Sequence, residues 1–338
     1  MAPIATLLLI VLRLPDVDAA LAVETLRSVD ALPPHIAGQF REPAGFVAIA
    51  GGAFLVFDRR GHSVYQVDAQ RSVVTPVVSV GGEAGRVLQP VAFAVGADGS
   101  FVVADAPAGR ERVQLFTTDG VRMRAFAMPG HVEPRVQIGG LVLNGIGSLQ
   151  YDGTRIYVNQ PENGALISAY STDGVPERSI GRLRATPFES SDPDLHLSFN
   201  TGLPVLNPRG GFYFVFQTGE PRFRKYDAKG TLLFERVIQG RELDDWLATQ
   251  PTKWPTRQKS SRELPVVPPV VRTAAADPAG RLWVSFTLPY TYVFDEDGDK
   301  VRVVQFRAAG TLAPTSLSFA GGHRVLVTPG CYIFDAGQ

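Results

Sequence analysis

The chain repeats one hydrophobic pattern six times. Each repeat has an apolar stretch, a turn that contains glycine, a second apolar strand, a polar loop and a strand that contains an aromatic residue. The opening strand pairs occupy residues 46–58, 91–105, 146–159, 203–216, 273–286 and 317–328. The third strands occupy residues 64–68, 113–120, 166–174, 223–230, 292–298 and 332–336. Glycine turns between apolar strands favour β-hairpins, so the pattern predicts six antiparallel sheets.

A fourth strand follows five of these units, as in VRMRAFAM (121–128) and TLLFERVI (231–238). Four short strands per repeat are typical of a β-propeller. Without two longer segments, 182–200 and 240–268, the chain from residue 23 onward divides into units of about 45 residues. Propeller blades span roughly 40–50 residues. We therefore predict an all-β fold, a six-bladed β-propeller of four-stranded antiparallel blades, in a single domain over residues 23–338.

The sixth unit lacks a fourth strand of its own. The segment VETLRSV (23–29) is similar to TLLFERV (231–237), the fourth strand of the fourth unit. We expect the N-terminal strand to complete the last blade. Such closure would remove the free sheet edges that invite aggregation.

The second unit carries a family resemblance. It reads LQPVAFAV (88–95), then DGSFVVAD (98–105) and ERVQLFTTDG (111–120). This run resembles an NHL repeat, closely over 90–120, more loosely over 146–174 and only in outline elsewhere. The resemblance implies a six-bladed propeller that serves as a binding scaffold. Related six-bladed rings include lyases, lactonases and strictosidine-synthase-like enzymes, so the fold does not settle the function.

The N-terminus resembles a secretory signal peptide. Residues 5–12 (ATLLLIVL) form an apolar run too short to span a bilayer, and Ala20-Leu21-Ala22 is a small-x-small cleavage site. Against this, no Lys or Arg precedes the run, and the alternative is a buried strand or helix. We predict cleavage after Ala22 and a secreted or periplasmic protein without a transmembrane segment.

The net charge and the cysteine count make some classes of function less favourable than others. The 338 residues include 33 Lys+Arg and 33 Asp+Glu, so the formal net charge is zero. Some NHL domains bind RNA on a strongly basic face, but a balanced charge does not favour a nucleic-acid partner. The single cysteine, Cys331, excludes an internal disulfide and CxxC metal or haem motifs. We expect a monomer.

Successive strands of a blade run in alternating directions, and this predicts which face of the ring carries function. Turns between first and second strands, and between third and fourth, lie on one face and are tight and glycine-rich. The remaining loops and both long segments lie on the other face, which we call the loop-rich face. Variable loops on a rigid scaffold commonly carry binding sites, so we place the site there.

Polar loop residues on that face are the candidate ligand-binding residues. They are Asp58, Arg60, His62, Asp105, Arg110 and Asn159, together with Trp246 and Trp254 of the second long segment. Arginine suits carboxylate and phosphate groups, so a polar ring at the pore mouth would bind an anionic or polar ligand. Alternatively, the aspartates cap loops and pair with nearby arginines to join blades. We favour this alternative, because exposed ion pairs are common and weak.

The second long segment, 240–268, begins with a predicted short helix at 242–249 and then becomes proline-rich and basic. Its two tryptophans suit a lid or a partner-binding hook, since aromatic residues anchor interfaces. They suit a covering loop packed on the ring equally well.

Metal chemistry has little support in the sequence. None of the five histidines is spaced as a metal pair, and we expect each to be solvated unless His62, His131 and His196 converge. The first strands should line the channel with mostly small or apolar residues: Ala48, Ala94, Leu149, Val205, Ala275 and Ser318. The Glu, Asn and Asp set that the resemblance to lactonases implies is not visible, although Asn159 and Asn207 are available.

Two functions follow. The first is a scaffold, without catalytic residues or a cofactor, that recognises a protein, peptide or glycan through the loop-rich face. The alternative is a metal-dependent lyase or hydrolase, lactonase-like or amidating-lyase-like, acting at the pore mouth with calcium or zinc.

Overall fold

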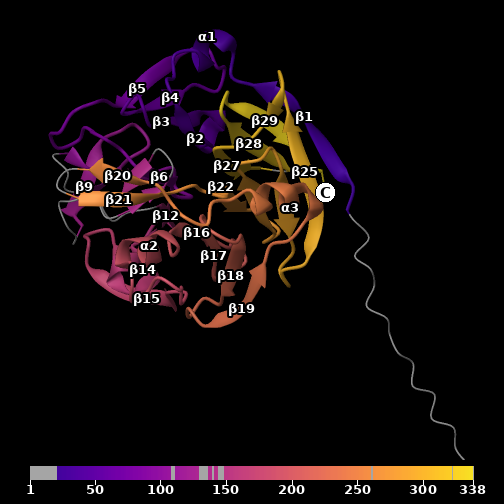
Figure 1. Cartoon of the computed structure of the whole chain (residues 1–338). Coiled ribbons are helices and arrows are strands. Elements are labelled where there is room, and N and C mark those ends of the chain that lie inside the picture. Colours follow the sequence, from indigo (N-terminus) through magenta and orange to yellow (C-terminus); the bar gives the residue numbers. More distant parts are fainter. Residues whose placement is uncertain are drawn as a thin grey trace, which may run out of the picture.

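The blades form a closed ring around a central axis (Figure 1). The computed structural model describes residues 21–107, 111–128, 136–138, 141–143, 148–259, 262–321 and 323–337. Within these residues, six four-stranded antiparallel blades are present, and the predicted six-bladed β-propeller is confirmed. The proposed leader lies almost wholly outside the described residues and stays a prediction.

The blades follow the chain in order, each from its innermost to its outermost strand. Blade 1 contains β2 (Pro43–Ala48), β3 (Phe54–Asp58), β4 (Ser63–Val67) and β5 (Val74–Val78). Blade 2 contains β6 (Ala92–Val95), β7 (Phe101–Asp105), β8 (Arg112–Phe116) and β9 (Arg122–Ala127). Blade 3 contains β12 (Leu149–Tyr151), β13 (Arg155–Val158), β14 (Ala165–Ser171) and β15 (Pro176–Arg182). Blade 4 contains β16 (Gly202–Leu206), β17 (Phe212–Phe216), β18 (Arg222–Tyr226) and β19 (Leu232–Val237).

Blade 5 contains β22 (Val271–Ala276), β23 (Leu282–Phe286), β24 (Thr291–Phe294) and β25 (Lys300–Arg307), and the short β26 (Thr311–Leu312) pairs with β25. Blade 6 contains β27 (Ser316–Ala320), β28 (Arg324–Thr328) and β29 (Tyr332–Asp335), and β1 (Val23–Ala31) follows as its outermost strand.

Burial falls from the second strand of a blade to the fourth. Every residue of β3, β7, β17 and β23 is buried, whereas β9 is exposed along nearly its whole length. Each blade packs face to face on its two neighbours, so its second strand is covered on both faces and its outermost strand meets solvent. This explains why second strands read as continuous apolar runs.

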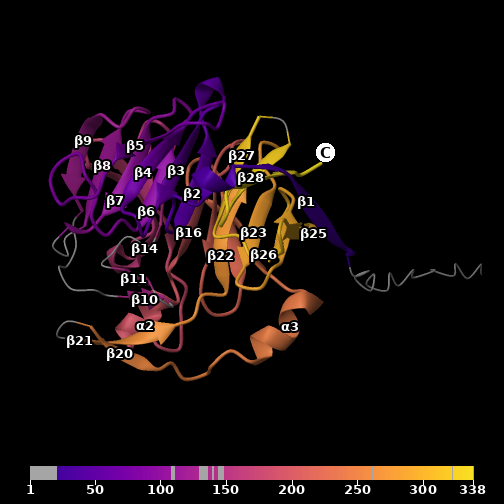
Figure 2. The same ribbon diagram turned by 90° about the horizontal axis from the view of Figure 1, so that it is seen from above.

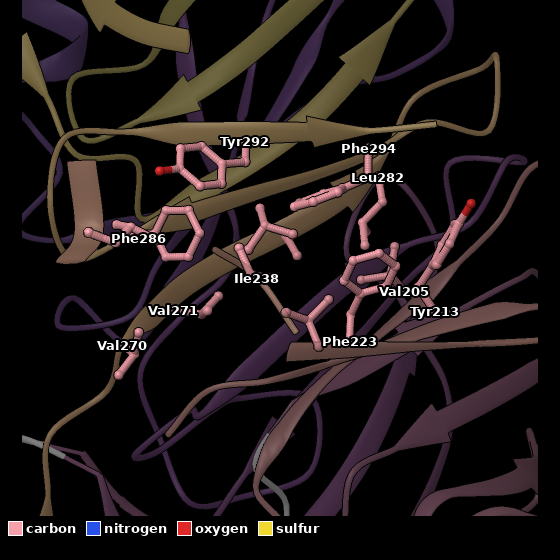
Figure 3. Packing of buried hydrophobic residues seen from close by; sticks show 14 of the residues in the cluster. Val205, Tyr213, Phe223, Ile238, Val270, Val271, Leu282, Phe286, Tyr292 and Phe294 are labelled. Atoms are coloured by element: carbon pink, nitrogen blue, oxygen red, sulfur yellow. The ribbon is translucent and has the colours of Figure 1, made fainter. Parts of the chain in front are cut away.

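A separate hydrophobic cluster fills each of the six blade interfaces. Figure 3 shows the cluster between blades 4 and 5, where Val205, Tyr213 and Phe223 face Phe286 and Phe294. Tyr213 and Phe286 are fully buried. The ring is therefore stabilised by side chains that meet between blades, not by a single central core.

The N-terminal strand closes the ring, as predicted, but it serves two blades. Residues 28–31 of β1 pair antiparallel with β29 and complete blade 6. Residues 23–27 pair in parallel with β25 of blade 5, which the sequence did not predict. Glu24 accepts two hydrogen bonds from the Arg302 guanidinium of β25, at 2.8 and 2.9 Å. The helix α1 (Pro34–Ala37) follows and buries Ile36 between blades 6 and 1.

An accessory layer covers part of one face of the ring (Figure 2). It contains α2 (Pro193–Ser198), α3 (Arg241–Ala248) and a small sheet of β10 (Val136–Ile138), β11 (Leu141–Leu143), β20 (Thr256–Lys259) and β21 (Arg262–Val267). The helix predicted at 242–249 is present within one residue, whereas the sheet was not predicted. No helix in the described part of the chain has the length and apolar character to cross a lipid bilayer.

Candidate functional site

The two faces of the ring differ in construction. Both long segments, 182–200 and 240–268, contribute to the accessory layer on the loop-rich face (Figure 2). The opposite face carries tight turns such as Asp119-Gly120, where Gly120 has a φ of 83°. A Cβ at Gly120 would lie 2.0 Å from the carbonyl oxygen of Val77, so this turn requires glycine.

Asp58, at the end of β3, has a structural role. Its side chain is buried, and its carboxylate accepts hydrogen bonds from the backbone N–H groups of Arg41, Glu42 and Gly61 at 2.8 to 3.0 Å. These bonds hold the segment that enters the first blade. The neighbouring Arg59 pairs with Glu42.

Asp105 occupies the corresponding position at the end of β7. It is fully buried and accepts hydrogen bonds from the Leu88 backbone N–H at 2.9 Å and from Arg112 Nε at 2.8 Å. The Arg112 guanidinium also donates to the backbone carbonyls of Gly82 and Arg86. Arg110, another of the predicted ligand-binding residues, lies outside the described residues.

Asn159 joins two blades. Its Nδ2 donates to the Leu166 carbonyl at 2.8 Å, within blade 3, and its Oδ1 accepts from the Gly202 backbone N–H at 3.0 Å, in blade 4. Asp58 and Asp105 hold loops as the structural alternative expected, although of the two only Asp105 forms an ion pair with an arginine in the described part of the chain. Asn159, which that alternative did not include, also has a structural role. Their role in ligand binding stays a prediction.

Arg60 and His62 lie in the loop after β3. Arg60 is exposed, and no described residue accepts a hydrogen bond from its side chain. His62 is half-buried and has a φ of 52°, in the left-handed region. Of the predicted residues that lie within the described ranges, Arg60 is the one that offers a free charge at this face.

The two tryptophans pack inside the accessory layer. Trp254 contacts the rings of Phe188 and Phe199 edge-on, with centroids 5.6 and 5.2 Å away. Trp246 of α3 packs on the cluster between blades 4 and 5. The Tyr292 hydroxyl lies 2.5 Å from Glu242 at the start of α3 and ties the helix to blade 5. These contacts favour the covering-loop interpretation of this segment.

The histidines do not form a metal site in the described part of the chain. His196 of α2 is buried, with Nδ1 2.9 Å from Thr186 Oγ1, so the expectation that it is solvated was wrong. The expectation failed because α2 packs on β10 and β21. His131 lies outside the described residues. No three His, Cys, Asp or Glu side chains among the described residues are grouped so that they could hold a metal ion.

A cluster of arginines lies on the loop-rich face between blades 3 and 4. Arg184 and Arg224 both stack on Phe216, with guanidinium carbons 5.1 and 5.4 Å from the ring centre. Burial, together with the charge of Arg222, lowers the pKa of Arg184 to about 10. Arg222 and Arg224 share Glu235 as an ion-pair partner. Arg222 also pairs with Glu220, so three guanidinium groups of this cluster face two carboxylates.

A central channel runs between the innermost strands. Its volume is about 530 Å³, and all six first strands contribute to its walls. Five of the six predicted first-strand residues line it: Ala94, Leu149, Val205, Ala275 and Ser318. The lining also includes Arg59, Gln217 and Arg272, and among the described residues it includes no Asp, Glu, His or Cys. Gln217 and Arg272 were missed, although a lone arginine between the apolar runs VVPPVV and TAAA was a visible signal.

Comparison with protein-family models and with curated proteins finds no match for this sequence. Several solved structures are similar. A catalytically inactive histidine-to-alanine variant of virginiamycin B lyase from Staphylococcus aureus, with quinupristin, gives a TM-score of 0.52 at 10% identity, covering 85% of this chain and 77% of that one. A streptogramin B lyase gives 0.50 at 12% identity, covering 87% and 92%. The calcium-binding protein regucalcin from Agrobacterium tumefaciens gives 0.51 at 13% identity, covering 93% and 95%.

These likenesses establish the fold. At such low identity the activities of those proteins do not transfer, because one propeller scaffold supports unrelated functions. The NHL resemblance rests on the sequence of the second unit and stays a prediction.

Proposed function

We propose that this protein is an NHL-like binding scaffold that recognises a protein or peptide partner through its loop-rich face. The observation that carries the proposal is the accessory layer, which is built on this face alone among the described parts of the ring (Figure 2). A rigid ring positions such a layer without itself moving, which limits the entropy lost on binding.

The charges of the accessory layer support a protein or peptide partner. Lys253 and Arg257 are exposed in and beside the β20–β21 hairpin, and Arg60 is exposed on the same face. Asp244 and Asp245 are exposed on α3. Patches of both signs complement a partner of mixed charge and guide its orientation.

A glycan partner has less support. Sugar rings commonly stack on the flat faces of exposed aromatic side chains, but Trp246 and Trp254 pack against other residues of the protein. Their contacts with the ring and the accessory layer compete with stacking on a ligand.

The metal-dependent enzyme is the competing function. Its support is the likeness to two lyases and to a calcium-binding protein. The residues that line the channel offer guanidinium, amide and hydroxyl groups, which are poor donors for calcium or zinc compared with carboxylate and imidazole. Stoichiometric calcium or zinc in the purified protein, with a rise in melting temperature on adding that ion, would favour the enzyme over the scaffold.

The scaffold is tested with a phage-displayed library of 12-residue peptides selected on the purified protein. The binding of an enriched peptide is then measured by fluorescence polarisation against a double variant of the hairpin, Lys253→Glu with Arg257→Glu. Reversing two charges at the rim of an interface should weaken binding about tenfold.

The matched control carries the same charge change away from this face. It combines Lys229→Glu, in a turn on the opposite face, with Arg122→Glu, on the exposed strand β9. We expect the control to bind the peptide as the unmodified protein does. Equal affinity for all three proteins, or an equal loss in the control, would contradict the assignment of the binding face.

A further inference from the structure

The inner strand of blade 5 contains a β-bulge at the loop-rich end of the channel. In the pairing of β22 with β23, Val271 lies opposite Phe286 and Thr273 lies opposite Ser285, so Arg272 is the extra residue. A bulge leaves its extra residue unpaired and redirects that side chain. Here it places an exposed arginine in the lining of the channel.

The backbone around Arg272 is held from two sides. The Gln217 carbonyl, at the end of the second strand of blade 4, accepts hydrogen bonds from the N–H groups of Val270 and Val271 at 2.7 and 3.2 Å. The Thr287 N–H donates to the Val270 carbonyl at 3.0 Å. Gln217 is also among the residues that line the channel. Arg272 and Gln217 thus both belong to the lining, and backbone hydrogen bonds connect the two segments that carry them.

Within the described ranges of the chain, Arg272 has no counter-charge. Arg59, the other arginine of the lining, pairs with Glu42, but no described residue forms an ion pair or a hydrogen bond with the Arg272 side chain. The described lining contains no acidic residue at all. A guanidinium in a channel without carboxylates attracts an anion, and its planar fork suits a carboxylate or a sulfonate.

The channel walls also offer apolar surface. Partly exposed apolar side chains contribute to it, among them Val47, Phe93, Leu203, Leu206 and Phe319. A volume of about 530 Å³ lies within the range of small-molecule pockets, which combine apolar walls with a few oriented polar groups.

We propose that the channel is a binding site for a small organic anion, whose carboxylate or sulfonate contacts Arg272 and Gln217 and whose apolar body lies against the inner strands. The residues of this site, Arg272 and Gln217, are different from Lys253 and Arg257, on which the test of the partner-binding surface depends. Either proposal can therefore fail without the other.

Two fluorescent probes that differ in charge test the site. The anionic probe is 8-anilinonaphthalene-1-sulfonate, and N-phenyl-1-naphthylamine is its neutral analogue without the sulfonate. We expect the purified protein to bind the anionic probe at one saturable site. The substitution Arg272→Gln should weaken that binding about tenfold or more, because hydrogen bonds to a charged group are lost. Its affinity for the neutral probe should change less than twofold.

Two further variants distinguish the loss of the Arg272 contact from a general loss of positive charge. Arg122→Gln removes a positive charge from the outer surface of blade 2 and should leave both affinities unchanged. Arg272→Lys keeps the charge and should retain part of the affinity for the anion. Near-ultraviolet circular dichroism establishes that each variant is folded. Unsaturable binding of the anionic probe, unchanged affinity in folded Arg272→Gln, or an equal loss for the neutral probe would overturn the proposal.

Discussion

The closure of the ring by β1 can be tested at a single residue. Leu26 is the one buried residue of that strand, at 8% exposure. It packs in the cluster between blades 5 and 6, with Trp283, Phe306 and Phe334. Because β1 pairs with strands of both blades, this side chain stabilises the seam where the two ends of the chain meet. The perturbation is Leu26→Ala.

The expected loss follows from the burial of the side chain. Leucine-to-alanine substitutions in protein cores cost about 2–5 kcal/mol, and the cost falls where the surroundings can collapse into the cavity. Leu26 lies on the outermost strand, so we expect the lower end, about 2–3 kcal/mol. In a domain of this size each kcal/mol corresponds to roughly 2 °C, which predicts a fall of about 4–6 °C in melting temperature.

The assay is thermal and urea-induced unfolding followed by circular dichroism, with Val29→Ala as the matched control. Val29 lies on the same strand but is 61% exposed, so its truncation should cost less than about 0.5 kcal/mol. Hydrogen exchange should accelerate first in β1, β25 and β29. If Leu26→Ala and Val29→Ala were equally stable, or if exchange accelerated evenly around the ring, the closure argument would be refuted.

Two further predictions concern buried polar groups. Asp105→Asn leaves the Arg112 guanidinium without its counter-charge and should lower the free energy of unfolding by about 2–3 kcal/mol in urea denaturation. Asp173→Asn, which breaks an exposed pair with Arg124, should change it by less than about 0.5 kcal/mol, and similar losses for both would argue against a structural role for Asp105. Burial raises the pKa of the Cys331 thiol to about 12. The native protein should therefore not react with a disulfide reagent at pH 8, whereas one thiol per chain should react in denaturant; rapid reaction of the native protein would contradict this.

Much of the fold was predictable because each blade is encoded locally. The pattern around 91–105 sets two strands and a tight turn from neighbouring residues alone, and its repetition implies a ring. Even the N-terminal strand could be assigned, since a sixth unit without a fourth strand requires a donor. Its division between two blades could not be assigned, because the parallel pairing with β25 joins residues nearly the whole chain apart.

The accessory sheet was missed for the same reason. Residues 262–267 contain a proline and charges and look like a loop. They form a strand by pairing with the neighbouring β20 and also with β10, more than a hundred residues earlier. Pairing over such distances depends on where the ring brings the segments, which no local pattern records.

The candidate site, like the fold, could be predicted only in part from the sequence. The residue types at the ends of the second strands suggested either binding or capping. Only the structure shows that the side chains of Asp58, Asp105 and Asn159 accept hydrogen bonds from backbone N–H groups. Arg272 reaches the channel through a bulge whose register depends on its neighbouring strand.

The number of blades, their strand order and the face that carries the long loops can all be predicted from the amino-acid sequence. These features follow from periodicity and from turn chemistry between adjacent residues. Only the packed ring shows which polar groups form hydrogen bonds inside it and which remain free toward the channel. That distinction depends on burial and partner geometry, which arise only when residues distant in sequence are packed together.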